Sequence, residues 1–350
     1  MTRIAAVHGA LPPYRYAQHE LTDAFASLCL PDGASHGVLK RVHANAGVSY
    51  RHLALPLEEF IALKDFGAAN DAWIASAVDL GAEAVAAALD QAGLTVADVD
   101  LLMFTTVTGL AAPSIDARVA ARLGLREDVR RLPLFGLGCV GGAAGVARVH
   151  DYLKAWPGQV GVLLSVELCS LTLQRDDASM PNLVAGALFG DGATAVVMTG
   201  AEHPAARGPS VLATRSRLYP DSERVMGWDV GAGGFRVVLG AEVPDVVRKY
   251  LGGDVPAFLA DHGLSVPEIA AWVCHPGGPK VLEAVAETLA LRPGALDLTW
   301  QSLDAVGNLS SSSVLQVLGA TIATGPEPGT PGLMLAMGPG FCSELVLLEW

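Results

Sequence analysis

The chain has 350 residues, of which 51% are hydrophobic and 17% are charged, and its formal net charge is −13. A chain of this length and composition can bury a large core, which excludes an intrinsically disordered protein. The acidic balance argues against nucleic acid as a partner, because binding to a phosphate backbone needs a basic face.

The first 66 residues contain several prolines and read as an irregular region. Within it, the segment LKRVHANAGVSYRHL carries Lys40, Arg41 and Arg51 and no acidic residue. A solvated helix face is the simpler interpretation of such a cluster. The alternative is a rim that contacts the phosphates of a small ligand.

Beyond this region, apolar runs of strand length alternate with segments of helical periodicity. A long helix is predicted over residues 70–91, with Asn70 as its N-cap and Gly93 as its stop signal. Further helices are predicted over residues 113–123, after Cys139, over residues 243–260, from Pro279 and after GNLSSSS. Strands are predicted just before Cys139 and at residues 99–109, 159–167, 192–200, 211–218, 234–239, 270–275 and 333–350.

This alternation is typical of βαβ units in sheets that are buried on both faces. Residues 200–209 read as a linker, and the elements follow in a similar order on either side of it. We therefore predict an α/β fold made of two similar halves, residues 1–200 and residues 210–350.

The sequence contains no pattern that predicts a membrane span, a disulfide framework or a metal site. The longest near-apolar run, residues 132–147, is rich in glycine and falls short of the roughly 20 residues that a spanning helix needs. The first 16 residues lack the hydrophobic core of a signal peptide. The five cysteines are scattered, without a CxxC pair. We expect a cytoplasmic protein without a structural zinc site.

Residues 132–153, LPLFGLGCVGGAAGVARVHDYL, place Cys139 between an apolar run and the start of a small-residue helix. A thiol on such a strand-to-helix turn lies at the positive end of a helix dipole, which favours its ionisation. The flanking glycines leave room for a substrate to approach closely. A small buried residue at a helix–strand contact is the simpler interpretation. The local sequence leaves both interpretations open.

Two other polar residues stand at similar junctions before helices. His275 ends an apolar strand and opens the turn HPGGP, from which its side chain can point into a cleft beyond the strand ends. Asn308 lies in the turn GNLSSSS. Nucleophilic cysteine catalysis needs an imidazole or another base, and usually a third polar group. The simpler alternatives are a histidine satisfied at a strand end and an asparagine that caps a helix.

The motifs GCVGG, HPGGP and GNLSS, in this order and at these separations, resemble those of the type III polyketide synthases, the chalcone synthase-like enzymes. The segments ALFGDGATAVV, TTVTGLAAPSIDARVAARLGL and MGPGFCSELVLLEW agree with this resemblance, which covers nearly the whole chain. It implies a thiolase-like fold, in which two similar βα halves with buried mixed sheets are layered with helices in the order αβαβα. It also implies a homodimer.

The resemblance implies that Cys139 takes a starter acyl group from coenzyme A as a thioester, and that His275 pairs with its thiolate. His275 and Asn308 would then donate hydrogen bonds to the thioester carbonyl of malonyl-CoA. These bonds would stabilise the enolate that remains after loss of carbon dioxide. The enolate attacks the acyl group on Cys139, and repetition builds a polyketide, with coenzyme A thioesters as substrates and no cofactor.

The resemblance extends to residues around the substrate. Phe189 in LFGDG matches an aromatic gatekeeper between the coenzyme A tunnel and the cavity, although a core phenylalanine is the simpler interpretation. Arg41 and Lys280 are expected beside the coenzyme A phosphates at the tunnel mouth. The residues expected to line the cavity are Thr106, Thr172, Gly227, Phe235 and Met337, the last in AMGPG where relatives have GFGPG.

Two departures from the family pattern bear on the substrate. Asn45 stands where many relatives have a lysine, and LAAPS at residues 110–114 replaces a methionine–proline segment that relatives lend across the dimer. Small Ala111 and Ala112 there would widen a pocket, which favours an aliphatic starter.

We therefore predict a type III polyketide synthase that extends an acyl-CoA starter, aliphatic in chemistry, with malonyl-type CoA units. Its product would be an alkylpyrone or alkylresorcinol, and an acyl-carrier protein is considered as a further source of starter. One alternative is a single-condensation 3-oxoacyl-carrier-protein synthase. Another is a catalytically silent acyl-CoA-binding subunit of the same fold.

Overall fold

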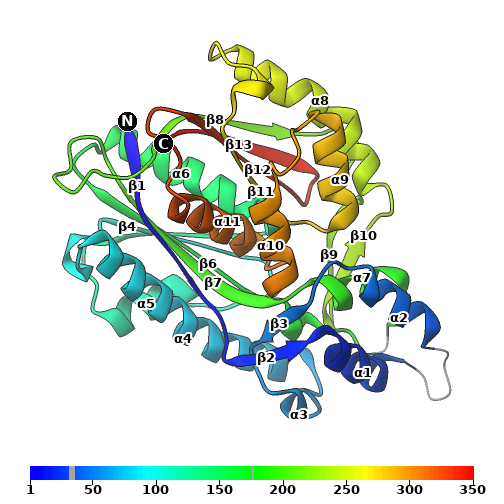
Figure 1. Cartoon of the computed structure of the whole chain (residues 1–350). Coiled ribbons are helices and arrows are strands. Elements are labelled where there is room, and N and C mark those ends of the chain that lie inside the picture. Colours follow the sequence, from blue (N-terminus) through cyan, green and yellow to red (C-terminus); the bar gives the residue numbers. More distant parts are fainter. Residues whose placement is uncertain (31–35, 176) are drawn as a thin grey trace.

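A mixed sheet of nine strands runs through the part of the chain that the computed structural model describes, residues 1–30, 36–175 and 177–350 (Figure 1). Its strand order is β11-β12-β13-β8-β1-β7-β6-β4-β5, and two smaller sheets pair β9 with β10 and β2 with β3. The strands are β1 (Thr2–Ala10), β2 (Tyr14–Ala17), β3 (Tyr50–Leu53), β4 (Leu101–Thr106), β5 (Arg130–Phe135), β6 (Val160–Leu168), β7 (Asp191–Thr199), β8 (Ser210–Leu218), β9 (Met226–Gly231), β10 (Gly234–Leu239), β11 (Ala271–Cys274), β12 (Pro331–Gly338) and β13 (Cys342–Glu349).

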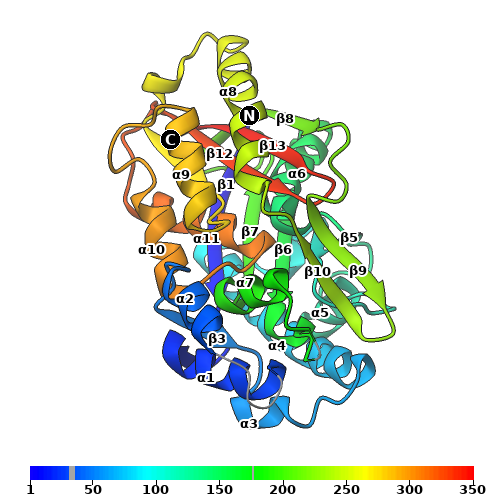
Figure 2. The same ribbon diagram turned by 90° about the vertical axis from the view of Figure 1, so that its right-hand side faces the viewer.

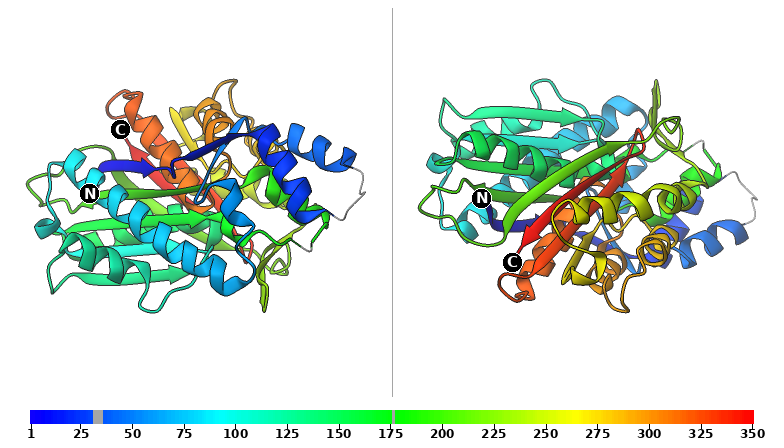
Figure 3. Two further views of the ribbon diagram at one scale, coloured as in Figure 1. Left: turned by 90° about the horizontal axis from the view of Figure 1, so that it is seen from below. Right: turned by 90° about the horizontal axis from the view of Figure 1, so that it is seen from above.

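The helices of the two halves form three layers, with the sheet between them (Figures 1 and 3). One outer layer contains α4 (Phe66–Ala92) and α5 (Ile115–Leu123), and the other contains α8 (Val243–Ala260) and α9 (Pro279–Thr288). The middle layer is formed by α6 (Gly141–Ala155) and α11 (Ser311–Ala323), which pack on each other. The remaining helices are α1 (Gln18–Cys29), α2 (Gly37–Ala44), α3 (Leu57–Phe60), α7 (Met180–Leu188) and α10 (Asp297–Val306).

Separate clusters of buried side chains fill the spaces between these layers. One lies between the α4–α5 layer and the first half of the sheet, and includes Trp73 and Leu164. A second surrounds the two central helices and includes Val146 and Leu318. A third lies between α8, α9 and the second half of the sheet and includes Phe258. The predicted α/β fold with αβαβα layers is therefore confirmed.

The two parts of the large sheet repeat one topology. In the first part β4 is parallel to β6, while β6, β7 and β1 follow each other antiparallel. In the second part β11 is parallel to β12, while β12, β13 and β8 follow each other antiparallel. Pairing of β1 with β8 at Thr2 and Arg3 joins the two parts. We propose residues 1–200 and 210–350 as the structural halves, with 200–209 linking β7 to β8.

The expectation of an irregular region over the first 66 residues is wrong. Where the structure describes it, this region holds β1 in the middle of the sheet, as well as β2, β3, α1, α2 and α3. The sequence of β1, TRIAAVHGA, lacks a run of β-branched residues, so its local propensity for a strand is weak. Antiparallel pairing with β7 over most of its length decides its conformation. Strand β9 was also not expected from the sequence.

The N-cap assigned to the long helix is wrong as well. Helix α4 begins at Phe66, and the Asp65 carboxylate accepts a hydrogen bond from the backbone N–H of Ala68 at 2.8 Å. Asn70 lies one turn inside the helix, where its side-chain amide exchanges two hydrogen bonds of 2.8 Å with the backbone of Leu110. The end of the helix at Gly93, with φ of 64°, agrees with the prediction.

Helix α4 is long and apolar enough to cross a membrane by length and composition. Half of its most apolar window is buried, and the helix packs on β1, β6 and β7. Core helices of globular proteins have the same properties.

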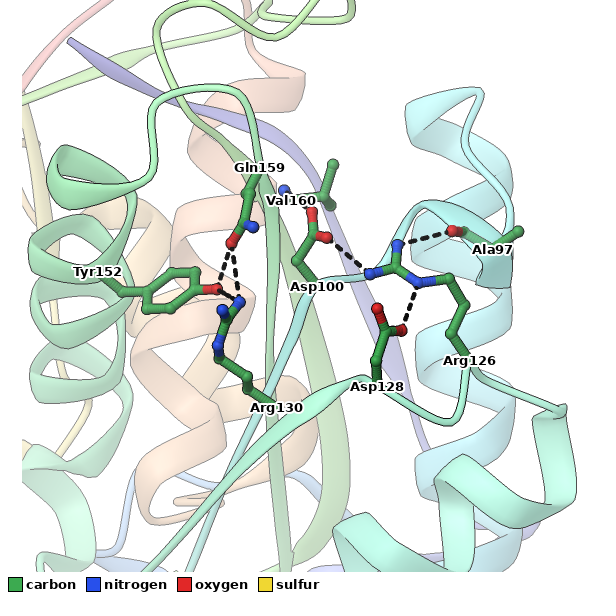
Figure 4. Close-up of polar contacts among 8 residues, drawn as sticks. All are labelled: Ala97, Asp100, Arg126, Asp128, Arg130, Tyr152, Gln159 and Val160. Atoms are coloured by element: carbon green, nitrogen blue, oxygen red, sulfur yellow. Dashed lines mark hydrogen bonds and ion pairs between the residues drawn. The ribbon is translucent and has the colours of Figure 1, made fainter.

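Polar contacts surround the C-terminal end of the central helix α6 (Figure 4). Asp100 accepts hydrogen bonds from the backbone N–H of Val160 and from the guanidinium of Arg126, both at 2.8 Å. Arg130 of β5 donates to the hydroxyl of Tyr152 in the last turn of α6 at 2.8 Å. The Arg130–Tyr152 bond ties the last turn of α6 to β5, while the Asp100 bonds tie the start of β4 to the start of β6 and to Arg126.

We expect Gly142→Ala to reduce the free energy of unfolding by about 1–3 kcal/mol, because the added methyl group overpacks the contact between the central helices. A Cβ at this position would lie 2.2 Å from the backbone oxygen of Ser311 and 2.8 Å from a methyl group of Val314. Urea unfolding measures the loss.

Gly158→Ala is the matched control, because a Cβ at residue 158 meets nothing within 4 Å. This variant should stay within about 0.5 kcal/mol of the parent protein. An equal loss for both variants would contradict the proposed tightness of the α6–α11 contact.

Candidate active site

Cys139 lies in a single 3₁₀ turn, Gly138–Val140, that leads directly into α6. Glycine is required just before it, because Gly138 has φ of 54° and a Cβ there would lie 2.7 Å from the Pro339 ring. The Cys139 thiol is buried, and its Sγ lies 3.8 Å from the hydroxyl of Ser310. The turn therefore presents the thiol at the N-terminal end of the central helix.

His275 and Asn308 reach the same place from the second half of the chain. His275 follows β11, and its backbone N–H donates to Leu335 at 2.9 Å. Neither ring nitrogen of this buried imidazole has a hydrogen-bond partner among the described residues. The side-chain oxygen of Asn308 accepts the backbone N–H of Ser310 at 2.8 Å, and its NH2 group is the donor that acts on the Cys139 thiol.

One cavity of about 880 Å³ brings these three side chains together. The structure therefore places Cys139, His275 and Asn308 around one space, although they come from three separate junctions of the chain. The same cavity is also lined by Phe189, Met337, Arg41 and Lys280, the residues that sequence reasoning assigned to the gate, the cavity wall and the tunnel mouth.

A second, smaller cavity of about 40 Å³ adjoins the first one at Phe189, which lines both. Thr172 and Phe235 line this smaller space, together with Trp228 from the β9–β10 hairpin, which projects from one side of the molecule (Figure 2). Phe189 therefore stands between two compartments.

Two residues expected in the cavity wall lie elsewhere. Gly227 lines neither cavity, whereas its neighbour Trp228 does, so the expected position is displaced by one residue along β9. Thr106 is buried behind the site and also lines neither cavity. Its hydroxyl instead donates to Glu167 at 3.3 Å.

Burial dominates the electrostatics of the reactive pair. It raises the pKa of the Cys139 thiol to about 12, and hydrogen bonds from Ser310 and Asn308 partly oppose this rise. Burial lowers the pKa of His275 to about 3. Burial alone thus favours a neutral thiol and a neutral imidazole. An imidazole with both nitrogens unengaged can accept the thiol proton, and an ion pair in the cavity is stabilised by its own attraction and by the positive end of α6.

Sequence reasoning missed a buried polar cluster behind the thiol. Glu167 accepts hydrogen bonds from the backbone N–H of Val107 and the hydroxyl of Thr108, both at 3.0 Å, and from the hydroxyl of Ser311. Burial raises the pKa of this carboxyl, and its charge in turn raises the pKa of Cys139. The available signal was the lone charge in the otherwise uncharged strand VGVLLSVEL.

The described residues contain no group of three or more histidine, cysteine or acidic side chains that could hold a metal ion. The large cavity places a thiol, an imidazole and hydrogen-bond donors around a largely apolar space. This set of groups suits acyl transfer through a thioester.

Comparison with known proteins agrees with this chemistry. Residues 3–203 match the model "Chalcone and stilbene synthases, N-terminal domain", and residues 211–349 match the corresponding C-terminal domain. The chain is 60% identical to a 1,3,6,8-tetrahydroxynaphthalene synthase of Streptomyces peucetius subsp. caesius, over 100% of this chain and 93% of the relative. It is 31% identical to a 3,5-dihydroxyphenylacetyl-CoA synthase of Streptomyces toyocaensis, over 99% of this chain and 90% of the relative.

Among solved structures, the 1,3,6,8-tetrahydroxynaphthalene synthase of Streptomyces coelicolor A3(2), a bacterial type III polyketide synthase, superposes with a TM-score of 0.93. The match has 27% sequence identity and covers 99% of both chains. The chain therefore belongs to the chalcone and stilbene synthase family, and it is a type III polyketide synthase, an enzyme of the acyltransferase type.

Proposed function

We propose that this enzyme condenses malonyl-CoA with itself and releases 1,3,6,8-tetrahydroxynaphthalene. The observation that carries the proposal is 60% identity, over the whole chain, to a relative named for this product. The named product has ten carbons, oxygens on alternate positions and no alkyl chain. Five malonyl groups that each lose one carbon dioxide supply such a skeleton. The relative from Streptomyces toyocaensis is likewise named for an aromatic product, 3,5-dihydroxyphenylacetyl-CoA.

In this proposal Cys139 is the nucleophile, and His275 accepts its proton when a coenzyme A thioester enters the cavity. The thiolate attacks the thioester carbonyl, coenzyme A leaves, and the acyl group stays on Sγ. The His275 ring and the Asn308 amide then donate hydrogen bonds to the thioester oxygen of the next malonyl-CoA. This stabilises the enolate formed by loss of carbon dioxide, which attacks the acyl group on Cys139.

The remaining residues would guide the substrate. Arg41 and Lys280 both line the large cavity, and their positive charges suit the phosphates of coenzyme A. Phe189 borders both cavities, so its ring can control passage of the growing chain from one to the other. We infer that the working enzyme is a cytoplasmic homodimer that uses coenzyme A thioesters.

A second candidate is the alkylpyrone or alkylresorcinol synthesis from an aliphatic starter that the sequence predicted. The wall of the 880 Å³ cavity favours this candidate, because part of the wall is apolar and could hold an alkyl chain. The residues of this wall are Met226, Leu239, Val243, Val247, Leu335 and Phe341. The names of the relatives give this candidate no support, and they give none to an acyl-carrier protein as partner.

The purified enzyme should convert malonyl-CoA alone into 1,3,6,8-tetrahydroxynaphthalene, measured by liquid chromatography and mass spectrometry. Addition of hexanoyl-CoA or octanoyl-CoA should not divert most of the product to alkyl-substituted compounds. Cys139→Ala should abolish product formation, because no other group would hold the acyl chain.

Three results would contradict this proposal in different ways. Activity only in the presence of an acyl-CoA would favour the aliphatic candidate. Products of one condensation would indicate a ketoacyl synthase. Unchanged turnover by Cys139→Ala would show that the assigned nucleophile is wrong.

Alkylation of Cys139 by iodoacetamide tests the role of His275. In His275→Gln the rate at pH 7 should fall by about tenfold or more, because only the thiol with its raised pKa remains. The rate of this variant should then rise about tenfold per pH unit up to pH 9, since the thiolate fraction grows by that factor below the pKa. The parent enzyme should depend less steeply on pH over this range.

Peptide mass spectrometry provides an internal control in the half-buried Cys342, whose pKa burial raises to about 11. Its alkylation should be the same in both proteins. If Cys139 of the variant reacts as fast as that of the parent at pH 7, His275 does not ionise the thiol.

A further inference from the structure

A short backbone bridge joins the two halves of the chain inside the site. Phe189 from the first half and Asn308 from the second form an isolated parallel β-bridge. The N–H of Asn308 donates to Leu188 at 2.8 Å, and the N–H of Gly190 donates to the carbonyl of Asn308 at 3.0 Å. The backbone that carries the Asn308 amide is therefore held by the segment that carries the Phe189 ring.

Arg51 of β3 lies directly against this bridge. Its guanidinium Nη1 donates to the backbone carbonyl of Phe189 at 2.9 Å. Its aliphatic stem fills the space beside both bridge segments, because a Cβ added at Gly307 would lie 3.1 Å from the Arg51 Cγ and one added at Gly190 would lie 3.6 Å from it. One side chain thus contacts residues on both sides of the junction between the halves.

The Arg51 side chain is itself fixed and charged. It is 5% exposed, and its Nε donates to the side-chain oxygen of Gln18 at 3.1 Å. Gln18 in turn donates to the backbone carbonyl of Ala187 at 2.8 Å, just before the bridge. Burial lowers the pKa of Arg51 to about 10 and the Asp191 carboxylate opposes this, so the guanidinium stays protonated at neutral pH.

None of the contacts described for Arg51 involves Cys139 or His275. The thiol depends on the turn before α6, and the imidazole depends on the end of β11. Loss of the Arg51 contacts would therefore disturb the Asn308 amide and leave the nucleophile and its base in place. A small displacement of a hydrogen-bond donor is enough to slow a step that depends on it.

We propose that Arg51 is a positioning residue, which holds the Phe189–Asn308 bridge so that the Asn308 amide can stabilise the enolate formed from malonyl-CoA. The inference rests on the proposed function, because it assumes the role assigned there to Asn308. It separates the two half-reactions in degree. Decarboxylation depends directly on the Asn308 amide, whereas acylation of Cys139 depends on this amide only through one hydrogen bond to the thiol, whose pKa is set mainly by burial.

A double-mutant cycle tests the proposal with the parent enzyme, Arg51→Gln, Asn308→Ala and the double variant. Release of labelled carbon dioxide from malonyl-CoA reports decarboxylation. Intact-protein mass spectrometry with hexanoyl-CoA, which has no carboxylate to lose, reports acylation of Cys139. Arg51→Gln should slow carbon dioxide release about tenfold or more and change the acylation rate less than about twofold. In the Asn308→Ala background, the same substitution should cost less than about twofold.

Arg15→Gln is the matched control. Arg15 lies on β2, which pairs with β3, and its guanidinium stacks 3.6 Å from the centroid of the Tyr50 ring without a described contact to the bridge. Both rates should stay unchanged in this variant. Arg51→Lys retains one donor for the Phe189 carbonyl and should release carbon dioxide at an intermediate rate, which keeps the test valid if Arg51→Gln does not fold.

Equal losses in acylation and decarboxylation would overturn the proposal, because they would indicate a general structural effect. The proposal would also be overturned if the fold-loss of carbon dioxide release in the double variant equalled the product of the two single losses. Arg51 would then act independently of Asn308. If Asn308→Ala alone left carbon dioxide release unchanged, the role of Asn308 in the proposed function would fail together with this inference. Failure of the Arg51 inference alone can therefore be distinguished from failure of the proposed role of Asn308.

Discussion

The close contact between the two central helices is the constraint on which the site depends. Helices α6 and α11 begin at Gly141 and Ser311, and they approach so closely at Gly142 that a single methyl group would meet the backbone of Ser311. Cys139 and Asn308 lie only two or three residues before these helix starts. Contact between the helix starts therefore brings the thiol of Cys139 from one half of the chain to the amide of Asn308 from the other half.

Burial gives this site its chemical character. Polar groups that are removed from water interact strongly with each other and are costly when left without partners. Most buried polar groups near the thiol are paired, as Glu167 is with Thr108 and Ser311. Among the described residues the Thr105 hydroxyl and the His275 ring are exceptions, and the ring has two unengaged nitrogens and lines the cavity. An unpaired buried imidazole is a cost in stability that a catalytic role explains, since a substrate or a thiol proton would supply the missing partner.

The N-terminal region has a larger role than its irregular sequence pattern indicates. Strand β1 lies between β7 and β8, and so connects the two parts of the large sheet. Strand β3 delivers the buried Arg51 to the Phe189 carbonyl, and α2 brings Arg41 to the cavity. The chain thus uses its first residues to join the two halves and to complete the wall of the site.

The fold class, most elements beyond residue 66 and the choice of Cys139, His275 and Asn308 as candidate site residues could be predicted from the sequence, because glycine-rich turns before helices and apolar strand patterns are local properties. Strand β9 and helices α7 and α10 were not predicted. The sequence did not determine the conformation of β1, the N-cap of α4 or the positions of Thr106 and Gly227. These depend on partners that are distant in the chain, such as β7 for β1, Leu110 for Asn70 and Glu167 for Thr106. Tertiary structure alone placed Arg51 on the Phe189–Asn308 bridge, because a buried cation finds its acceptors only after the two halves have packed together.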